Sequence, residues 1–353
     1  MDKIFNVGLI GYSAGGRIYN GPIIDSVPGF QITKIFERKD ENVRLANKNF
    51  PRASIVSSIN NILEDELIDL VVIAVPTPQH YSLARQSLLS NRHTIVEKPF
   101  TITSEESEDL IKLSEEKNKL LSIHHNRTWD NDFLTVKKII KERLLGRLVQ
   151  YECNFNRFRP DIKHNTWKEV NSKGSGVLYD LGSHLIHQAI FLFGLPKYIN
   201  ANVGIERTGG LAPDFFKLTL HYDDLTVNLN SSMLVRANLP HFVLLGDKGS
   251  YVKFGMDPQE EDLKKGLIPK NHEEWGMESE DNWGEIDTLI NGIHIKGKVE
   301  SAKGDYRKYY QNIYNTLIGK DKLIITPKQA RDVIKVIEMA MESSDKGCTV
   351  SFK

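Results

Sequence analysis

A lysine at the end of a short apolar run is the first residue suited to chemistry. Residues 94–99 read Thr-Ile-Val-Glu-Lys-Pro, so Lys98 follows a predicted strand and precedes Pro99, which ends the strand and fixes the backbone. Ligands bind at the carboxyl ends of strands in open α/β sheets. An ammonium group there could hydrogen-bond a substrate oxygen, and a solvated surface charge is the alternative.

An acid and two imidazoles form the second candidate. Asp180, His184 and His187 stand at i, i+4 and i+7, on one face of a predicted helix that Gly194 ends. A carboxylate one turn from an imidazole can orient it and stabilise its charged form, as a general base requires. Buried histidines capped by a carboxylate are one alternative. A divalent metal site is another, but no further ligand cluster is evident, and we expect none.

A third group of polar and aromatic residues follows the last strand of the first half. A polyhydroxylated ligand needs many donors and acceptors and a flat apolar surface, which these residue types supply. With Lys98 and His187, the predicted substrate-binding residues are Asn126, Arg127, Trp129, Asp130, Arg157 and Trp167. A salt-bridge network between domains would use the same residues.

A glycine-rich loop directly follows the first apolar run. Residues 11–16 read Gly-Tyr-Ser-Ala-Gly-Gly and resemble the G-x-G-x-x-G fingerprint, in which glycines permit a tight turn and close approach of the backbone to a pyrophosphate. Gly11 and Gly16 match, and Ser13 replaces the middle glycine. The phosphate would lie at the amino end of the next helix. A plain glycine-rich turn is the alternative.

The end of the second predicted strand bears on the choice of cofactor. Glu37, 26 positions past Gly11, could accept hydrogen bonds from a free ribose diol, which favours NAD. Arg38 and Lys39 could hold a 2′-phosphate, which favours NADP. We expect NADP, and NAD is the alternative. A further alternative is that residues 37–39 form a solvated charged turn that binds no cofactor.

Alternating strands and helices position these residues in the first half of the chain. Apolar runs predict strands at 4–10, 31–36, 70–75, 94–96 and 120–123, and amphipathic runs predict helices at 17–25, 42–49, 81–90 and 104–117. The nearly continuous apolar strands are typical of a parallel sheet covered on both faces. Residues 1–124 therefore predict a doubly wound α/β Rossmann domain.

The pattern changes after residue 124. A helix at 133–143 precedes strand-like runs at 149–155, 198–204, 215–222, 226–234, 242–245 and 251–254, and helices at 306–318 and 327–343 follow. Residues 125–353 therefore predict an α+β domain with a large open, mostly antiparallel sheet. Residues 257–305 are polar and glycine-rich and give no secure assignment.

Composition excludes several classes of protein. The 353 residues are 40% apolar, and 46 basic residues balance 46 acidic ones, so no basic excess is present to neutralise nucleic-acid phosphates. The longest apolar run is far shorter than the roughly 20 residues of a membrane span, and the first ten residues do not form a signal peptide. Two cysteines, Cys153 and Cys348, are too few for a disulfide framework. We expect a cytoplasmic enzyme.

Taken together, the glycine loop, Glu97-Lys98-Pro99 and the Asp180-x-x-x-His184 pattern resemble the Gfo/Idh/MocA oxidoreductases, and most of all the scyllo-inositol 2-dehydrogenase (NADP+) branch. Further shared strings lie at 125–135, 178–184, 254–260 and 341–344. The resemblance implies a homodimer or homotetramer formed through the open sheet. Residues 75–80 loosely match a string that lies under the nicotinamide in the family, and His187 stands where inositol-type members often carry Asp.

The resemblance also implies site roles. Lys98 would hydrogen-bond the reacting hydroxyl and His184 would accept its proton, with Asp180 as the neighbour of His184. The complete predicted cofactor-binding set is Gly11, Ser13, Gly16, Glu37, Arg38, Lys39, Pro76, His80 and Glu97.

These observations predict a reversible NAD(P)-dependent dehydrogenase that acts on a secondary alcohol of a cyclitol or sugar. We expect Lys98 and His184, from separate domains, to meet around one carbinol beside the nicotinamide. One alternative is a sensor on the same scaffold that binds cofactor and sugar without turnover, although a sensor has no need for both Lys98 and the Asp180–His184 pair. A metal-dependent lyase or hydrolase is a second alternative.

Overall fold

The computed structural model describes residues 3–163 and 166–352. The chain divides into two compact units, each assembled from three segments. The first unit comprises Met1–Asn126, Gln259–Trp275 and Asp305–Arg331, and the second comprises Arg127–Pro258, Gly276–Gly304 and Asp332–Lys353.

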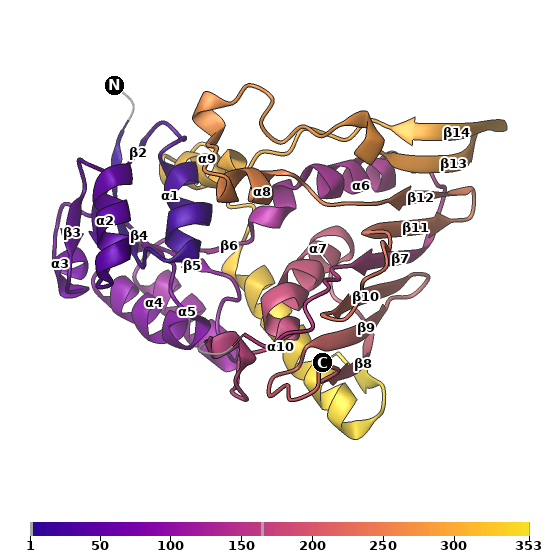
Figure 1. The fold of residues 1–353 in the computed structure, drawn as a ribbon, viewed down its shortest axis with the longest axis horizontal. Coiled ribbons are helices and arrows are strands. Elements are labelled where there is room, and N and C mark those ends of the chain that lie inside the picture. The colour runs from indigo at the N-terminus through magenta and orange to yellow at the C-terminus, as the bar shows by residue number, and fades with distance from the viewer. Residues whose placement is uncertain (1–2, 164–165, 353) are drawn as a thin grey trace. The chain divides into compact units, whose positions relative to one another are not determined.

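The first unit contains a six-stranded parallel sheet in the order β3-β2-β1-β4-β5-β6 (Figure 1). The strands are β1 (Phe5–Ile10), β2 (Phe30–Phe36), β3 (Ser54–Val56), β4 (Leu70–Ile73), β5 (His93–Glu97) and β6 (Leu121–His124). The five predicted strands are confirmed to within two residues at each end, whereas the three-residue β3 has no prediction. Every residue of β4 is buried, as expected for a central strand covered on both faces.

Helices connect these strands and confirm the doubly wound pattern. They are α1 (Gly21–Ile24), α2 (Asp40–Asn49), α3 (Asn60–Leu63), α4 (His80–Leu89) and α5 (Ser104–Glu116), with a 3₁₀ turn at η2 (Thr77–Gln79). At the start of α5 the Thr103 hydroxyl accepts from the Glu106 amide at 3.2 Å, and the Glu106 carboxylate accepts from the Thr103 amide at 3.2 Å. This capping box satisfies two donors that a helix start leaves free.

The first helical segment differs from the single helix predicted at 17–25. A π-helical turn, η1 (Gly15–Asn20), precedes α1, and the Gly21 amide donates to Gly16 O, five residues earlier. Pro22 has no amide proton to continue a regular ladder, so the wider turn carries the chain into α1.

Three later segments complete the first unit: α8 (Gln259–Lys264), α9 (Arg307–Leu317) and the start of α10 (Pro327–Lys346), with a short turn at η6 (Pro269–Asn271). From α9, the Tyr309 hydroxyl donates to Ser122 Oγ in β6 at 3.0 Å, and the Tyr314 ring packs edge-on against Phe5 and Phe30. Buried aromatic contacts therefore fix α9 on the parallel sheet.

The second unit contains a nine-stranded sheet in the order β14-β13-β12-β11-β7-β10-β9-β8-β15. Every neighbouring pair is antiparallel except β7 with β10. The strands are β7 (Leu148–Asn154), β8 (Tyr198–Gly204), β9 (Phe215–His221), β10 (Thr226–Ser232), β11 (Phe242–Gly246), β12 (Gly249–Lys253), β13 (Gly284–Ile290), β14 (Ile293–Val299) and β15 (Val350–Ser351). The predicted large, mostly antiparallel sheet is confirmed.

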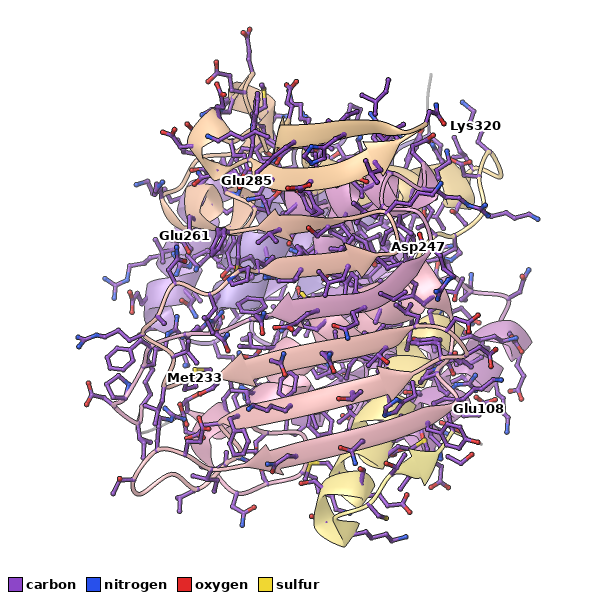
Figure 2. All side chains as sticks on the ribbon, turned by 90° about the vertical axis from the view of Figure 1, so that its right-hand side faces the viewer. Glu108, Met233, Asp247, Glu261, Glu285 and Lys320 are labelled. Atoms are coloured by element: carbon purple, nitrogen blue, oxygen red, sulfur yellow. The ribbon has the colours of Figure 1, made fainter. Side chains whose placement is uncertain are left out.

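One face of this sheet is covered and the other is open. Leu218 and Leu220 of β9 and Val227 and Leu229 of β10 are buried, whereas the residues between them are partly or fully exposed. Two helices, α6 (Asn131–Lys141) and α7 (Ser183–Phe193), lie on the covered side (Figure 1). Figure 2 shows the opposite face, which carries side chains but no helix.

The stretch 257–305 contains structure that the sequence analysis leaves unassigned. Besides α8 and the short turn η7 (Glu280–Asn282), it supplies the β13–β14 hairpin. The hairpin turn is Asn291-Gly292, and both residues have positive φ, 52° and 82°. Asn-Gly between two strand-like runs is a strong signal for a two-residue hairpin, so this element could have been predicted.

Candidate active site

The glycine loop after β1 has the geometry of a dinucleotide cradle. Gly11 has φ +96°, and a Cβ at this position would lie 2.5 Å from Ala74 O. A Cβ on Gly16 would clash with the carbonyl oxygen of Gly11, so only glycine permits the loop and the following turn to pack this closely. Ser13, at the middle position of the fingerprint, is exposed at the loop. The backbone therefore fits the pyrophosphate of a dinucleotide.

The position of this loop in the sheet agrees with that role. The Gly11 amide donates to Phe36 O of β2 at 3.1 Å, and the Ala74 amide donates to Ile10 O of β1 at 2.8 Å. The order of strands reverses between β1 and β4, and ligands of open α/β sheets bind outside the carboxyl ends of strands at such a switch point.

Glu37 lies at the end of β2 with both carboxylate oxygens engaged. Oε1 accepts from the amides of Arg38 at 2.8 Å and Lys39 at 3.0 Å, and Oε2 accepts from Asn42 Nδ2 at 3.0 Å and the Tyr12 amide at 3.2 Å. Burial raises the pKa of Glu37, but these four hydrogen bonds outweigh burial and hold the pKa below its ordinary value. The carboxylate links the glycine loop to the turn after β2.

The two cations after Glu37 are directed outward. Arg38 and Lys39 are both exposed, and the Arg38 guanidinium lies 5.7 Å from the centre of the Phe36 ring. Their exposure leaves both side chains accessible to a ligand, and the contact with a ribose phosphate stays a prediction.

Glu97 and Asn20 connect the glycine loop to Lys98. Asn20 Nδ2 donates both to Gly15 O at 2.9 Å and to Glu97 Oε1 at 2.6 Å, and Glu97 Oε2 accepts from the Lys98 amide at 3.1 Å. His124 Nδ1 donates to the same Glu97 Oε1 at 2.8 Å. Burial raises the pKa of Glu97, but His124, Lys98 and Asn20 outweigh it and hold the pKa below its ordinary value. Sequence reasoning missed Asn20 and His124, because their contacts join separate strands and turns.

His80 supports the same loop from the other side. Its ring nitrogens face two backbone carbonyls, Pro99 O at 2.8 Å and Val75 O at 2.9 Å. Burial lowers the pKa of His80, although the carbonyls act in the opposite direction. The Lys98–Pro99 peptide is cis, and Pro76 is exposed before the 3₁₀ turn η2. His80 thus holds the loop after β4 against the loop after β5.

In the second unit, Asp180 has a partner that the sequence did not suggest. The π-helical turn η5 (Leu178–Gly182) carries Asp180, and α7 begins at Ser183, so the predicted continuous helical face is interrupted between the acid and the histidines. Lys168 Nζ pairs with Asp180 Oδ1 at 2.8 Å. Lys168 follows Trp167, which is partly exposed at the start of η4 (Trp167–Glu169).

Both histidines of α7 are buried. His184 is 6% exposed and His187 is 1% exposed. Burial lowers the pKa of His187 to about 3, so this imidazole is neutral near pH 7. Its Nδ1 lies 3.5 Å from the Thr128 hydroxyl. In the described part of the chain no group of three or more His, Cys, Asp or Glu side chains is arranged to hold a metal ion.

The polar cluster after β6 is largely internal. Arg127 and Asp130 form a buried ion pair at 3.0 Å, and the Arg127 carbonyl accepts from Gln188 Nε2 at 3.1 Å. Trp129 is also buried, whereas Asn126 is partly exposed at the start of η3 (Asn126–Trp129). Arg127 and Asp130 thus form a local ion pair within the second unit, and the substrate contacts predicted for this cluster stay predictions.

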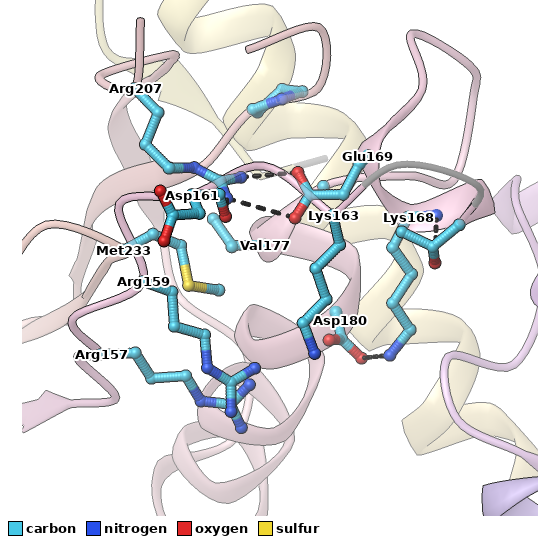
Figure 3. Close-up of a pocket in the computed structure, with 13 residues that line it drawn as sticks. Arg157, Arg159, Asp161, Lys163, Lys168, Glu169, Val177, Asp180, Arg207 and Met233 are labelled. Atoms are coloured by element: carbon cyan, nitrogen blue, oxygen red, sulfur yellow. Dashed lines mark hydrogen bonds and ion pairs between the residues drawn. The ribbon is translucent and has the colours of Figure 1, made fainter.

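A pocket of about 240 Å³ opens in the second unit beside Asp180 (Figure 3). Its lining combines charged side chains with a few apolar groups, among them Val177 and Met233. A pocket of this composition suits a small ligand rich in hydrogen-bonding groups.

The fold and the glycine loop define a dinucleotide-binding Rossmann unit joined to an α+β unit. Residues 5–125 match the NAD-binding Rossmann model of the oxidoreductase family, and residues 137–352 match the model of its C-terminal alpha/beta domain. The chain belongs to the Gfo/Idh/MocA oxidoreductase family. Its cofactor is accordingly NAD(P).

Similar proteins match the whole length of the chain. A Bacillus subtilis protein named scyllo-inositol 2-dehydrogenase (NADP(+)) IolW is 37% identical over 344 residues, which are 98% of this chain and 95% of that protein. The oxidoreductase YdgJ of Escherichia coli is 35% identical over 351 residues, 99% of each chain.

Solved structures of other oxidoreductases have the same fold over nearly the whole chain. The Bacillus subtilis oxidoreductase YvaA has a TM-score of 0.95 at 35% identity and covers 100% of this chain and 99% of its own. A Bacteroides fragilis oxidoreductase has a TM-score of 0.91 at 40% identity, with 99% and 100% covered. No helix in the described part of this chain has the length and apolar character to cross a bilayer.

Proposed function

We propose that the protein catalyses the reversible, NADP-dependent oxidation of a secondary alcohol of a cyclitol or sugar. The relative IolW is named for activity on scyllo-inositol with NADP(+), so scyllo-inositol is the first substrate to test.

The contact pattern of Asn20 is the observation that carries this proposal. One side-chain amide binds the glycine loop at Gly15 and the carboxylate of Glu97, which in turn accepts from the amide of Lys98. A single buried network within the first unit thus connects the dinucleotide cradle to Lys98 at the carboxyl edge of the same sheet. We infer that the ammonium group of Lys98 acts beside a bound nicotinamide.

When bound, the nicotinamide ring accepts or returns a hydride, which is chemistry that no side chain supplies. Lys98 hydrogen-bonds the reacting oxygen and stabilises the negative charge that develops on it, an effect typically on the order of 10²–10³ in rate. His184 accepts the hydroxyl proton, which contributes roughly 10²–10⁴. The carbinol loses its hydrogen as hydride and its hydroxyl proton to the imidazole, so the alcohol becomes a ketone.

The internal bonds of Glu37 support NADP rather than NAD. Its four hydrogen bonds already use both carboxylate oxygens, whereas Arg38 and Lys39 are exposed cations. A ribose 2′-phosphate would meet positive charge at this position. The free ribose diol of NAD would instead find the Glu37 acceptors already used.

Replacing Lys98 tests the proposal. We expect Lys98→Met to lower kcat with scyllo-inositol or myo-inositol and NADP by about 10²–10³, because the oxygen loses its charged donor. The affinity for NADPH, measured by fluorescence titration, should remain close to that of the wild type. Lys112→Met, an exposed lysine of α5, is the matched control and should keep full activity.

If Lys98→Met turns over substrate at the wild-type rate, Lys98 has no part in the mechanism. A wild-type protein that binds NADPH but oxidises no member of a broad polyol and sugar panel would instead favour the sensor alternative.

A further inference from the structure

The pocket beside Asp180 is lined by more basic than acidic side chains. Its basic side chains are Arg157, Arg159, Lys163, Lys168 and Arg207, and its acidic ones are Asp161, Glu169 and Asp180. A neutral polyol needs hydrogen-bonding groups but has no use for an excess of positive charge. The purpose of these cations is therefore a question separate from the redox chemistry.

Two of the cations are matched by carboxylates of the same unit. The Arg207 side chain, 3% exposed, pairs with Glu169 at 2.6 Å and with Asp214 at 2.8 Å. Lys168 pairs with Asp180 at 2.8 Å (Figure 3). These pairs build the wall of the pocket and leave no net positive charge of their own.

Arg157 and Arg159 come from one extended segment after β7, and Lys163 follows them in the chain. Arg157 N donates to Ser232 O at 2.9 Å, and Arg159 N donates to Met233 O at 2.7 Å. Alternate residues of an extended chain point to the same side, and Arg157 and Arg159 both line the pocket. Phe158, between them, instead has the Arg236 guanidinium 4.6 Å from its ring centre. The backbone therefore directs two guanidinium groups into one pocket.

Side-chain contacts show which of these cations can take a ligand. The Arg157 guanidinium lies 5.0 Å from the centre of the Phe155 ring, which orients it. Arg159 and Lys163 are exposed, and neither forms an ion pair with any carboxylate among residues 3–163 and 166–352. Figure 3 shows the guanidinium groups of Arg157 and Arg159 at the same end of the pocket.

We propose that Arg157, Arg159 and Lys163 form a subsite for an anionic group, so that the preferred substrate is a polyol carrying a carboxylate or a phosphate ester. This inference rests on the proposed dehydrogenase function and names its substrate class. Guanidinium groups bind both anions with paired, charge-assisted hydrogen bonds. A bound anion also relieves the repulsion among neighbouring cations.

Matched ligands test the subsite. NADP-saturated protein is titrated calorimetrically with glucose, glucuronate and glucose 6-phosphate, and with myo-inositol and inositol 1-phosphate. We expect the charged members to bind about tenfold or more tightly than the neutral ones, with an affinity that falls as salt rises. Tighter binding of glucuronate identifies a carboxylate substrate, and tighter binding of the phosphates identifies a phosphate ester.

The double variant Arg159→Gln/Lys163→Gln should lose about tenfold in affinity for the charged ligands and keep its affinity for neutral polyols. Lys141→Gln, an exposed lysine of α6, is the matched control and should change neither. Equal affinity for charged and neutral ligands, or charged-ligand affinity that the double variant leaves intact, would overturn the subsite.

Turnover measured in parallel separates the two proposals. Oxidation of neutral polyols without any preference for anions would contradict the subsite and remain consistent with the proposed function. If anion binding depends on Arg159 and Lys163 but no ligand is turned over, the result would contradict the dehydrogenase function and support the subsite.

Discussion

The carboxylate of Glu37 illustrates how internal partners limit what a side chain can recognise. From its position after the second strand, Glu37 is an acceptor for a ribose diol. In the folded chain it accepts four hydrogen bonds, from three backbone amides and Asn42, and thereby supports the glycine loop. The contact with the ribose that we predicted for it stays a prediction, and the exposed cation beside it becomes the better selectivity residue.

We therefore expect Arg38→Ala to weaken NADP binding and not NAD binding. A lost charge-assisted hydrogen bond to the 2′-phosphate costs about 1.5–3 kcal/mol, which corresponds to roughly ten- to a hundredfold in KM for NADP. Initial rates with each cofactor measure the ratio, and Lys48→Ala, an exposed cation of α2, serves as the control. An unchanged NADP-to-NAD ratio in Arg38→Ala would show that this turn does not select the cofactor.

Glu97 and His80 make the same point for the nicotinamide side. Both belong to the cofactor-binding set that the family resemblance implies. Glu97 accepts from Asn20, His124 and the Lys98 amide, and His80 faces the carbonyls of Val75 and Pro99. The partners come from several strands, and a linear pattern does not contain that information.

At the scale of elements, the turn after β1 combines the tightest packing with the site. Gly16 lies against the Gly11 carbonyl, and the π-helical turn η1 brings Asn20 to Gly15 O at 2.9 Å. An amphipathic pattern predicts a helix here but does not distinguish a π turn from an α turn. The wider turn depends on Pro22 and on the partners of Asn20.

Two adjacent glycines of this turn provide a matched pair. Gly16→Ala places a methyl group against the Gly11 carbonyl, so we expect it to lower the free energy of unfolding by about 1–3 kcal/mol and to weaken NADPH binding. Gly15→Ala meets its nearest neighbour, Ala74, at 3.5 Å and should leave stability within about 1 kcal/mol of wild type. Denaturant unfolding measures both variants, and equal effects would contradict the proposed steric cause.

At the scale of the whole molecule, the open face of the nine-stranded sheet is the feature with a consequence for assembly. Its side chains lie on strands whose opposite residues are buried, and no helix from the described part of the chain covers this face (Figure 2). The family resemblance implies an interface here. Val243 and Val252, paired across β11 and β12, are partly exposed near its centre.

We predict a homodimer or homotetramer formed through this face. Val252→Glu should shift the protein toward monomer in sedimentation velocity, because assembly through this face would bury the introduced charge. Leu67→Glu, at a position 73% exposed in the first unit, is the control and should leave the assembly unchanged. A wild-type protein that sediments as a monomer at micromolar concentration would refute the prediction.

The sequence by itself determined the two kinds of sheet, the glycine loop and the family. Burial on one face of a strand makes apolar and polar residues alternate, and burial on both faces gives a continuous apolar run. A phosphate cradle requires glycines at close spacing. These patterns can therefore be identified along the chain. Only the tertiary structure decided that 259–275 and 305–331 fold with the first unit, that Lys168 pairs with Asp180, and that Arg159 faces the same pocket. These contacts join residues distant in sequence, and their energies depend on burial and distance, which arise only when the chain has folded.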